Sequence, residues 1–301
     1  MAAGSRYLAF WSYSRFDDNS DDGWLTNLRE ALVTEIQQIS GKHVEIFQDT
    51  DGIEWGERWQ QKLTSSSDKA IFLIPIITPS YFESKACRSE LTQFVDRENA
   101  SAFKELILPL YYIETPKLTD QFEQASDYLV KVVAEHNYQD FTNLRHRSLA
   151  SHEAKGKITG LAKALMARID RYVLLQLHSA NMRARFESSH AMARRHANVA
   201  GNLENISDWV NVWLVVETTG VYHPQVLLPR DNAAFDTQVT IGRVDQDQGK
   251  EFPVHILAVT EKVTKSFGRY CQGAARQGSW PGVPKPEESR VLATTTLIRH
   301  E

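Results

Sequence analysis

The chain has 301 residues, of which 42% are hydrophobic and 24% are charged. This is the balance of an ordinary soluble globular protein of one to three domains. No apolar run approaches the ~18 residues of a transmembrane helix, and the first residues lead into a strand pattern without the features of a signal peptide. The only two cysteines, Cys87 and Cys271, are far apart, which argues against a disulfide framework or a cysteine-based zinc site. We therefore expect a cytoplasmic protein that makes no membrane contact.

The net charge of -4 is unevenly distributed along the sequence. Residues 1–140 hold 13 basic and 23 acidic residues, residues 141–200 hold 11 and 3, and residues 201–301 hold 10 and 12. The basic middle segment is most simply a solvated helix face. The alternative is an electrostatic contact with an acidic domain of another molecule or with nucleic acid. Nucleic acid is the least favoured partner, because Tyr172 and Phe186 are the only aromatic residues between 142 and 200.

Strand-like and helix-like patterns alternate over the first 147 residues. Short apolar runs predict strands at residues 7–13, 43–47, 70–78, 105–113 and 138–141. The run at 70–78 has no polar interruption, as expected for the middle of a parallel sheet covered on both faces. Helices are expected from Trp24 to Gly41, around 58–66, after Tyr81 and over 117–135. This alternation implies a parallel sheet with right-handed crossovers.

The rest of the chain divides into a helical and a β-rich part. Residues 148–200 predict the last helix of the first domain and a basic helical connector. The apolar stripe of this helix is Leu161, Leu165, Ile169, Tyr172 and Leu175. After Gly201, strand-like runs separated by turn residues predict a small sandwich-like β-rich domain over 201–301, with one helix near 262–272. The strands are expected at 210–216, 225–228, 237–242 and 253–259.

Three sequence blocks carry a family resemblance. The first is FWSYSRFD at residues 10–17, and the second is EIFQD at 45–49, followed by Ile53, Gly56 and Trp59. The third is the apolar run 71–80, followed by Tyr81, Phe82, Ser84 and CRSEL at 87–91. In this order they resemble a bacterial Toll/interleukin-1 receptor (TIR) domain of the NAD-cleaving type, over residues 5–175. The resemblance implies a flavodoxin-like, five-stranded parallel sheet of α/β class. No family is recognised in residues 201–301.

Glu90 is the residue on which the function depends. It follows the third expected strand, at the edge where open α/β folds place their ligands. The resemblance implies that Glu90 is the catalytic residue, that NAD+ is the substrate, and that no cofactor or metal is needed. Breaking the nicotinamide–ribose bond develops positive charge on the ribose, which one carboxylate can stabilise. Nicotinamide is already a good leaving group, so no second carboxylic acid is required.

The remaining site residues are also implied by the resemblance. The expected substrate-binding residues are Tyr13, Ser14, Arg15, Asp49, Trp55 and Ser84. Arg15 could instead pair with a nearby aspartate, Asp49 could cap its loop, and Trp55 could pack that loop against the sheet. Family members commonly carry Trp where this chain has Ala86. Trp11, Trp55, Trp59, Tyr81 or Phe82 would have to supply that aromatic surface.

The function expected from these residues is an NAD glycohydrolase or ADP-ribose cyclase of bacterial antiphage defence. The resemblance implies activation by oligomeric assembly through TIR–TIR contacts, and residues 201–301 would receive an activating ligand or protein. The alternative is a non-enzymatic TIR scaffold, for which Ala86 is the best support. A third reading is an enzyme that makes a nucleotide signal for a separate effector. A phosphate-accepting response regulator is excluded, because the third strand ends in Thr78-Pro79-Ser80 rather than in an acceptor aspartate.

Overall fold

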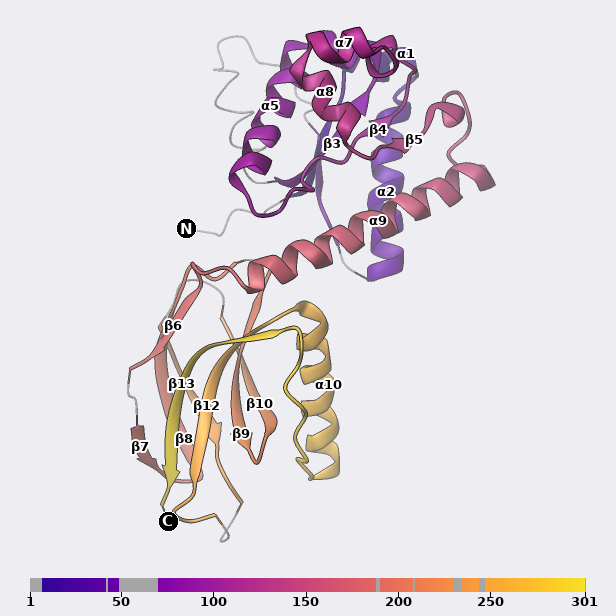
Figure 1. Ribbon diagram of the computed structural model, residues 1–301. Coiled ribbons are helices and arrows are strands. Elements are labelled where there is room, and N and C mark those ends of the chain that lie inside the picture. Colours follow the sequence, from indigo (N-terminus) through magenta and orange to yellow (C-terminus); the bar gives the residue numbers. More distant parts are fainter. Residues whose placement is uncertain are drawn as a thin grey trace, which may run out of the picture. The chain divides into compact units, whose positions relative to one another are not determined.

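The computed structural model describes residues 7–41, 43–48, 70–187, 190–207, 209–229, 234–243 and 247–300. The chain forms two compact units, Met1–Ile169 and Asp170–Glu301 (Figure 1). Within the described ranges, no helix combines the length and the apolar character that crossing a membrane requires.

The first unit is built on a parallel sheet of five strands in the order β2-β1-β3-β4-β5. The strands are β1 (Tyr7–Ser12), β2 (Ile46–Gln48), β3 (Ala70–Ile77), β4 (Leu110–Tyr111) and β5 (Gln139–Asp140). All eight residues of β3 are buried, as its uninterrupted apolar run predicts for a strand covered on both faces. The predicted flavodoxin-like α/β fold is confirmed.

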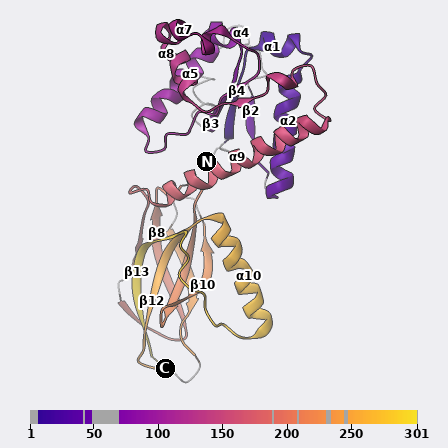
Figure 2. The same cartoon turned by 45° about the vertical axis from the view of Figure 1, so that its right-hand side comes forward.

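Helices cover both faces of this sheet. Helix α2 (Trp24–Ser40) and helix α5 (Lys85–Ala100) lie on opposite sides of it (Figures 1 and 2). Helix α2 buries Leu25, Leu28, Leu32 and Ile36 at helical spacing and ends at Gly41. The φ of Gly41 is 66°, a left-handed conformation that glycine adopts without steric cost. Two short helices, α1 (Arg15–Ser20) and α4 (Pro79–Glu83), follow β1 and β3 directly.

Two predictions in this unit need correction. The single helix expected over 117–135 is three helices, α6 (Pro116–Thr119), α7 (Gln121–Ser126) and α8 (Tyr128–Glu135). Asp120 and Asp127 each accept a hydrogen bond from the backbone N–H two residues later, so each starts a new helix. The expected strand 105–113 is reduced to β4 and one bridge between Leu73 and Ile107, since Pro109 has no N–H for the ladder. The helix expected around 58–66 lies outside the described residues.

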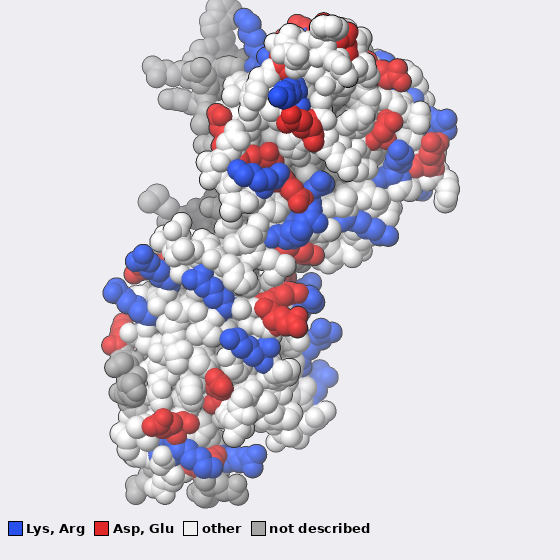
Figure 3. Space-filling model, viewed as in Figure 1, with Lys and Arg blue, Asp and Glu red and all other residues white. Residues whose placement is uncertain are grey.

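Helix α9 (His152–Leu177) begins in the first unit and carries part of the basic segment. Its predicted apolar stripe is buried at Leu161, Leu165 and Ile169, but Leu175 is exposed. Some of its basic groups are used within the first unit. The Nε of Arg168 lies 3.2 Å from Glu105 Oε2, and Lys157 Nζ donates to the carbonyl of Asp140 at 2.6 Å. Basic and acidic side chains are interspersed on the face shown in Figure 3.

The second unit contains two sheets and a helix. One sheet has the strand order β10-β9-β12-β13-β7, and the other has the order β11-β8-β6. The strands are β6 (Arg183–Phe186), β7 (His190–Ala193), β8 (His196–Glu204), β9 (Asn211–Thr218), β10 (Val221–Leu228), β11 (Ala234–Thr240), β12 (Glu251–Val259) and β13 (Ser289–Arg299). One apolar core includes Val199 and Phe235 from the small sheet and Leu214 and Ile256 from the large one. Helix α10 (Glu261–Gln277) packs on the large sheet through Phe267.

The helical connector predicted up to residue 200 is wrong. Helix α9 ends at Leu177, and strands β6, β7 and β8 begin before residue 200. In β8, buried Ala197, Val199 and Leu203 alternate with residues that are exposed or partly exposed, which is the period of a half-buried strand. These small apolar residues stand among Arg, His and Asn, so the segment resembles a polar helix in composition. Strand β13 was not predicted at all.

Candidate functional site

The centre of the parallel sheet provides the candidate site. Strands β1 and β3 are neighbours, and the chain leaves them toward opposite edges of the sheet, to β2 and to β4. Loops that diverge in this way leave a crevice beyond the carboxyl ends of the two strands, where open α/β folds bind ligands. Ser12 is the last residue of β1, and Pro79 follows β3.

Glu90 is attached to this edge by a hydrogen bond from Ser12. Glu90 lies on α5 and is 7% exposed, and Ser12 is 1% exposed. The Ser12 hydroxyl donates to Glu90 Oε2 at 2.5 Å. A short hydrogen bond to a carboxylate is charge-assisted and stronger than one between neutral groups. The carboxylate is thus held in one orientation at the end of the central strands.

Tyr81 and Cys87 support the same pair from within the core. The hydroxyl of Tyr81 lies 3.1 Å from Ser12 Oγ, and it donates to the carbonyl of Cys87 at 3.4 Å. Burial, followed by the charges of Cys87 and Glu90, raises the pKa of Tyr81 well above its usual value. Burial and then the charge of Glu90 raise the pKa of Cys87 to about 12. Both groups therefore stay neutral at physiological pH.

Tyr13 lies on the β2 side of the crevice. Its hydroxyl accepts a hydrogen bond from Gln48 Nε2 at 2.8 Å, and Arg29 Nε donates to Gln48 Oε1 at 2.5 Å.

Arg15 is exposed in the first turn of α1. The neighbouring carboxylates have structural roles, since Asp17 accepts from Thr78 Oγ1 at 2.6 Å and Asp18 accepts from the backbone N–H of Leu25 at 2.9 Å. The predicted site residues Asp49 and Trp55 lie outside the described residues.

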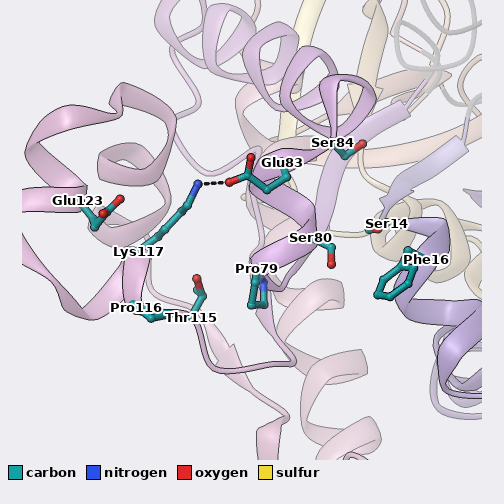
Figure 4. A pocket seen from close by; sticks show the side chains of 10 residues that line it. All are labelled: Ser14, Phe16, Pro79, Ser80, Glu83, Ser84, Thr115, Pro116, Lys117 and Glu123. Atoms are coloured by element: carbon teal, nitrogen blue, oxygen red, sulfur yellow. Dashed lines mark hydrogen bonds and ion pairs between the residues drawn. The ribbon is translucent and has the colours of Figure 1, made fainter.

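Ser14 and Ser84 are brought together at a hollow of about 660 Å³ (Figure 4). The wall also contains Phe16 from α1, Ser80 and Glu83 from α4, and residues from the segment after β4. Those residues are Thr115, Pro116, Lys117 and Glu123. Glu90 is not among the described residues that line the hollow. The hollow and the Glu90 carboxylate are therefore separate parts of the candidate site. Ser14 lies two residues after Ser12, and Ser84 is the N-cap of the helix that carries Glu90.

Three of the aromatic residues expected to replace a tryptophan at Ala86 are core residues. Trp11, Tyr81 and Phe82 are each at most 2% exposed, so they offer no free ring to a nucleotide. Trp55 and Trp59 lie outside the described residues. Phe16 is 70% exposed and presents its ring at the hollow (Figure 4).

Sequence reasoning missed Ser12, Thr115 and Lys117. Ser12 stands inside the first matched block, at the carboxyl end of a predicted strand, and that position was the available signal. The segment after β4 contains no motif that marks Thr115 or Lys117. Within the described parts of the chain, no group of three or more His, Cys, Asp or Glu side chains is arranged to hold a metal ion.

Comparison with known proteins identifies the first unit. A family profile described as TIR domain matches residues 10–154. The TIR domain of the Toll-related receptor TRR-2 from Hydra magnipapillata is 15% identical, with 46% of this chain and 89% of that chain covered and a TM-score of 0.31. The TIR domains of the activated Roq1 resistosome are 16% identical, with 52% and 84% covered and a TM-score of 0.31. No curated protein matches the chain. Residues 10–154 of this chain are a TIR domain.

Proposed function

We propose that the TIR domain cleaves the nicotinamide–ribose bond of NAD+, as an NAD glycohydrolase or ADP-ribose cyclase, with Glu90 as the catalytic carboxylate. The observation that carries the proposal is the position of Glu90, buried at the carboxyl end of β1 and hydrogen-bonded by Ser12 at 2.5 Å. A carboxylate shielded from water interacts more strongly with a developing positive charge than one in bulk solvent.

The proposed reaction needs only this carboxylate and a nucleophile. The bond between ribose C1′ and the nicotinamide nitrogen breaks, and both electrons leave with neutral nicotinamide. The cationic ribose that remains is stabilised by the Glu90 carboxylate. Water then bonds to C1′ and loses a proton, which gives ADP-ribose. Attack on C1′ by another atom of the same ADP-ribose would give a cyclic product instead.

Nicotinamide release from NAD+ tests this proposal. The protein is incubated at high concentration, so that any assembly can form, and is compared with Glu90→Gln. This substitution keeps the side-chain volume and removes the charge, so we expect release to fall by at least about 100-fold. Glu30→Gln, at an exposed position of α2, is the matched control. Release that survives Glu90→Gln would exclude Glu90 as the catalytic group.

We further propose that self-association of the TIR domain activates the enzyme. The proposal is motivated by two aromatic side chains that face solvent, Phe16 at 70% and Phe122 at 87% exposed, which a second copy could cover. Specific activity should rise with protein concentration, and Phe122→Ser should lower both the rate and the assembled fraction seen by light scattering. A specific activity independent of concentration would contradict activation by assembly.

We propose a biological role in bacterial antiphage defence, in which loss of NAD+ would stop metabolism in an infected cell. We propose a cytoplasmic protein in which the β-rich second unit receives the trigger. Cells that carry the chain should resist infection and lose NAD+ on infection, whereas cells with Glu90→Gln should do neither. Equal plaque counts for both would contradict this role.

A non-enzymatic TIR scaffold is the second candidate, and Ala86 favours it. The residue is small and half-buried, so it adds no aromatic surface beside Glu90. A scaffold would assemble normally with Glu90→Gln and would release no nicotinamide in any assembled state. The same assays therefore separate the two functions.

A further inference from the structure

The second unit has little net charge, but its basic residues are not evenly spread. Residues 201–301 hold 10 basic and 12 acidic residues. Between Lys262 and Pro286, however, there are five basic residues and no acidic one. Most of this stretch is helix α10, so the uneven distribution along the sequence produces a positively charged surface on one helix.

Four cations of α10 lie on one face of the helix. At about 100° and about 1.5 Å per residue, they fall within an arc of about 60° and extend over about 21 Å. The opposite face, with Val263 and Phe267, is buried on the large sheet. Figure 3 shows basic side chains one after another along the edge of the second unit that α10 forms in Figure 1. The four residues, all exposed, are Lys262, Lys265, Arg269 and Arg276.

Three of these cations are not neutralised by a neighbour. Lys262 Nζ lies 2.6 Å from Glu288 Oε1, whereas Lys265, Arg269 and Arg276 make no ion pair with any described residue. Like charges three or four positions apart on a helix repel each other and destabilise it. An anion that extends along α10 would remove this repulsion.

An exposed tryptophan lies at the carboxyl end of the same helix. Trp280 is 49% exposed, and its ring packs edge-on against Tyr270, with 6.0 Å between the ring centroids. The hydroxyl of Tyr270 accepts from the backbone N–H of Gly282 at 3.0 Å, and Val283 pairs with Tyr222 of β10. The loop that carries the indole is therefore tied to the helix and to the sheet, which holds the ring in place at the surface.

Charge and aromatic surface together favour single-stranded nucleic acid over other polyanions. Proteins bind such strands through a positive track along the phosphates and through aromatic side chains on which unpaired bases stack. At about 3.4 Å per phosphate, the roughly 21 Å of this helix face spans about six nucleotides. A duplex keeps its bases stacked inside and offers none to Trp280. A membrane surface would bind the apolar face of an amphipathic helix, and that face of α10 is buried on the sheet.

We propose that the second unit binds single-stranded nucleic acid along α10, with Lys265, Arg269 and Arg276 at phosphates and Trp280 stacked on a base. The proposal goes beyond the function proposed for the TIR domain and does not require that the protein cleave NAD+. The site lies outside the basic segment at 141–200. Composition conceals it, because acidic residues elsewhere in 201–301 balance its charge.

Fluorescence anisotropy of a labelled oligothymidylate of about 12 nucleotides tests the site. With the full chain we expect saturable binding. The logarithm of the association constant should fall against that of the salt concentration with a slope of about -2, as three phosphate contacts predict. Lys265→Gln and Arg269→Gln should each weaken binding about threefold or more and bring the slope about 0.7 closer to zero. Lys163→Gln, at an exposed position of α9, is the matched control and should change neither value.

Trp280 should have a different effect from the cations. Trp280→Ala should raise the dissociation constant about fivefold or more and leave the salt slope unchanged, whereas Trp280→Phe should retain most of the affinity. Melting temperatures equal to that of the wild type separate lost binding from misfolding. The same titrations with oligouridylate distinguish the two sources of such a strand, since the ligand bound more tightly identifies DNA or RNA.

Three results would overturn the proposal. No saturable binding of either oligonucleotide, or equal binding by the wild type and by the variant with both Lys265→Gln and Arg269→Gln, would exclude the site. Duplex DNA bound more tightly than the single strand, with no loss in Trp280→Ala, would replace it with a duplex site. Binding of vesicles that contain phosphatidylserine, without binding of either oligonucleotide, would replace it with a membrane-binding surface.

Discussion

Ser12 Oγ lies 2.5 Å from Glu90 Oε2, although the two residues are 78 positions apart in the sequence. The hydrogen bond joins the end of β1 to the second turn of α5. It gives the carboxylate a fixed orientation, and several consequences of this fixation can be measured.

Ser12→Ala should lower kcat for nicotinamide release more than it changes KM. In the proposed reaction the hydroxyl would not carry the reacting charge but would hold the group that does, so Ser12 would be a positioning residue. Loss of one hydrogen bond to a charged group is worth about 1.5–3 kcal/mol, which corresponds to about a 10- to 100-fold fall in rate. Ser12→Thr, which restores a hydroxyl, should recover part of the rate. Ser89→Ala, on the exposed face of the same helix, should be neutral, and equal loss from both alanine variants would contradict a positioning role.

Cys87 should resist alkylation in the folded protein. Burial and then Glu90 raise its pKa to about 12, and only the thiolate reacts. Cys271 is half-buried, and burial raises its pKa without help from a neighbouring charge. It should therefore react with iodoacetamide before Cys87 does. Mass spectrometry of the labelled peptides would show this order. Labelling of Cys87 at the rate of Cys271 would mean that the core beneath Glu90 is open to solvent.

Asp127 should contribute more to stability than a surface carboxylate. Its two oxygens accept from Arg88 at 2.6 and 3.2 Å, and Oδ1 also accepts from the backbone N–H of Leu129 at 3.0 Å. Asp127→Ala removes the ion pair and the helix cap together and should cost about 2 kcal/mol in the free energy of unfolding. Arg88→Met removes the pair and a long hydrogen bond of 3.4 Å to the carbonyl of Phe82 but keeps the cap, and should cost about 0.5–1 kcal/mol. Urea denaturation measures both, and equal costs would exclude the capping contribution.

The free energy of unfolding should depend on pH through His136. Its hydrogen bond with Glu98 Oε2, at 3.2 Å, is the main cause that raises its pKa above 6.5. Because the folded state binds the proton more tightly, this stabilisation is fully present below pH 6.5 and is lost as the pH rises through the folded-state pKa. Urea denaturation on both sides of this window should show a decline that His136→Gln removes and His43→Gln retains. An unchanged decline in His136→Gln would assign it to another group.

The sequence alone was sufficient for the parts of the fold that local patterns determine. The uninterrupted apolar run of β3 and the spacing of buried Leu25, Leu28 and Leu32 on α2 each have one structural solution, so the parallel sheet and its helices could be predicted. Strands β6 to β8 were missed because their apolar residues are isolated among Arg, His and Asn. Strand β13 was missed because its centre, Thr294 to Thr296, does not form an apolar run. These residues are identified as a strand only by their pairing with β12.

The candidate site, like the fold, has parts that local sequence patterns predict and parts that depend on contacts between distant residues. Glu90 could be located because it stands in a short local block. The hydrogen bond between Glu90 and Ser12 could not be predicted, because contact between residues 78 positions apart depends on the strand order. The hollow draws its wall from segments that follow β1, β3 and β4, so its composition emerges only when the sheet has formed.

Helix α5 contributes both to the hollow and to the position of the Glu90 carboxylate. Ser84 caps the start of α5 and lines the hollow, and Glu90 stands six residues further along the same helix, about 9 Å away along its axis. A helix is stiff over this length, so any shift that an occupant of the hollow imposes on the first turn is transmitted to the carboxylate. If a ligand in the hollow and a ligand at Glu90 influence each other through this helix, each alters the affinity of the other by the same factor. The first turns of α5 would thus make the carboxylate responsive to a ligand that it never touches.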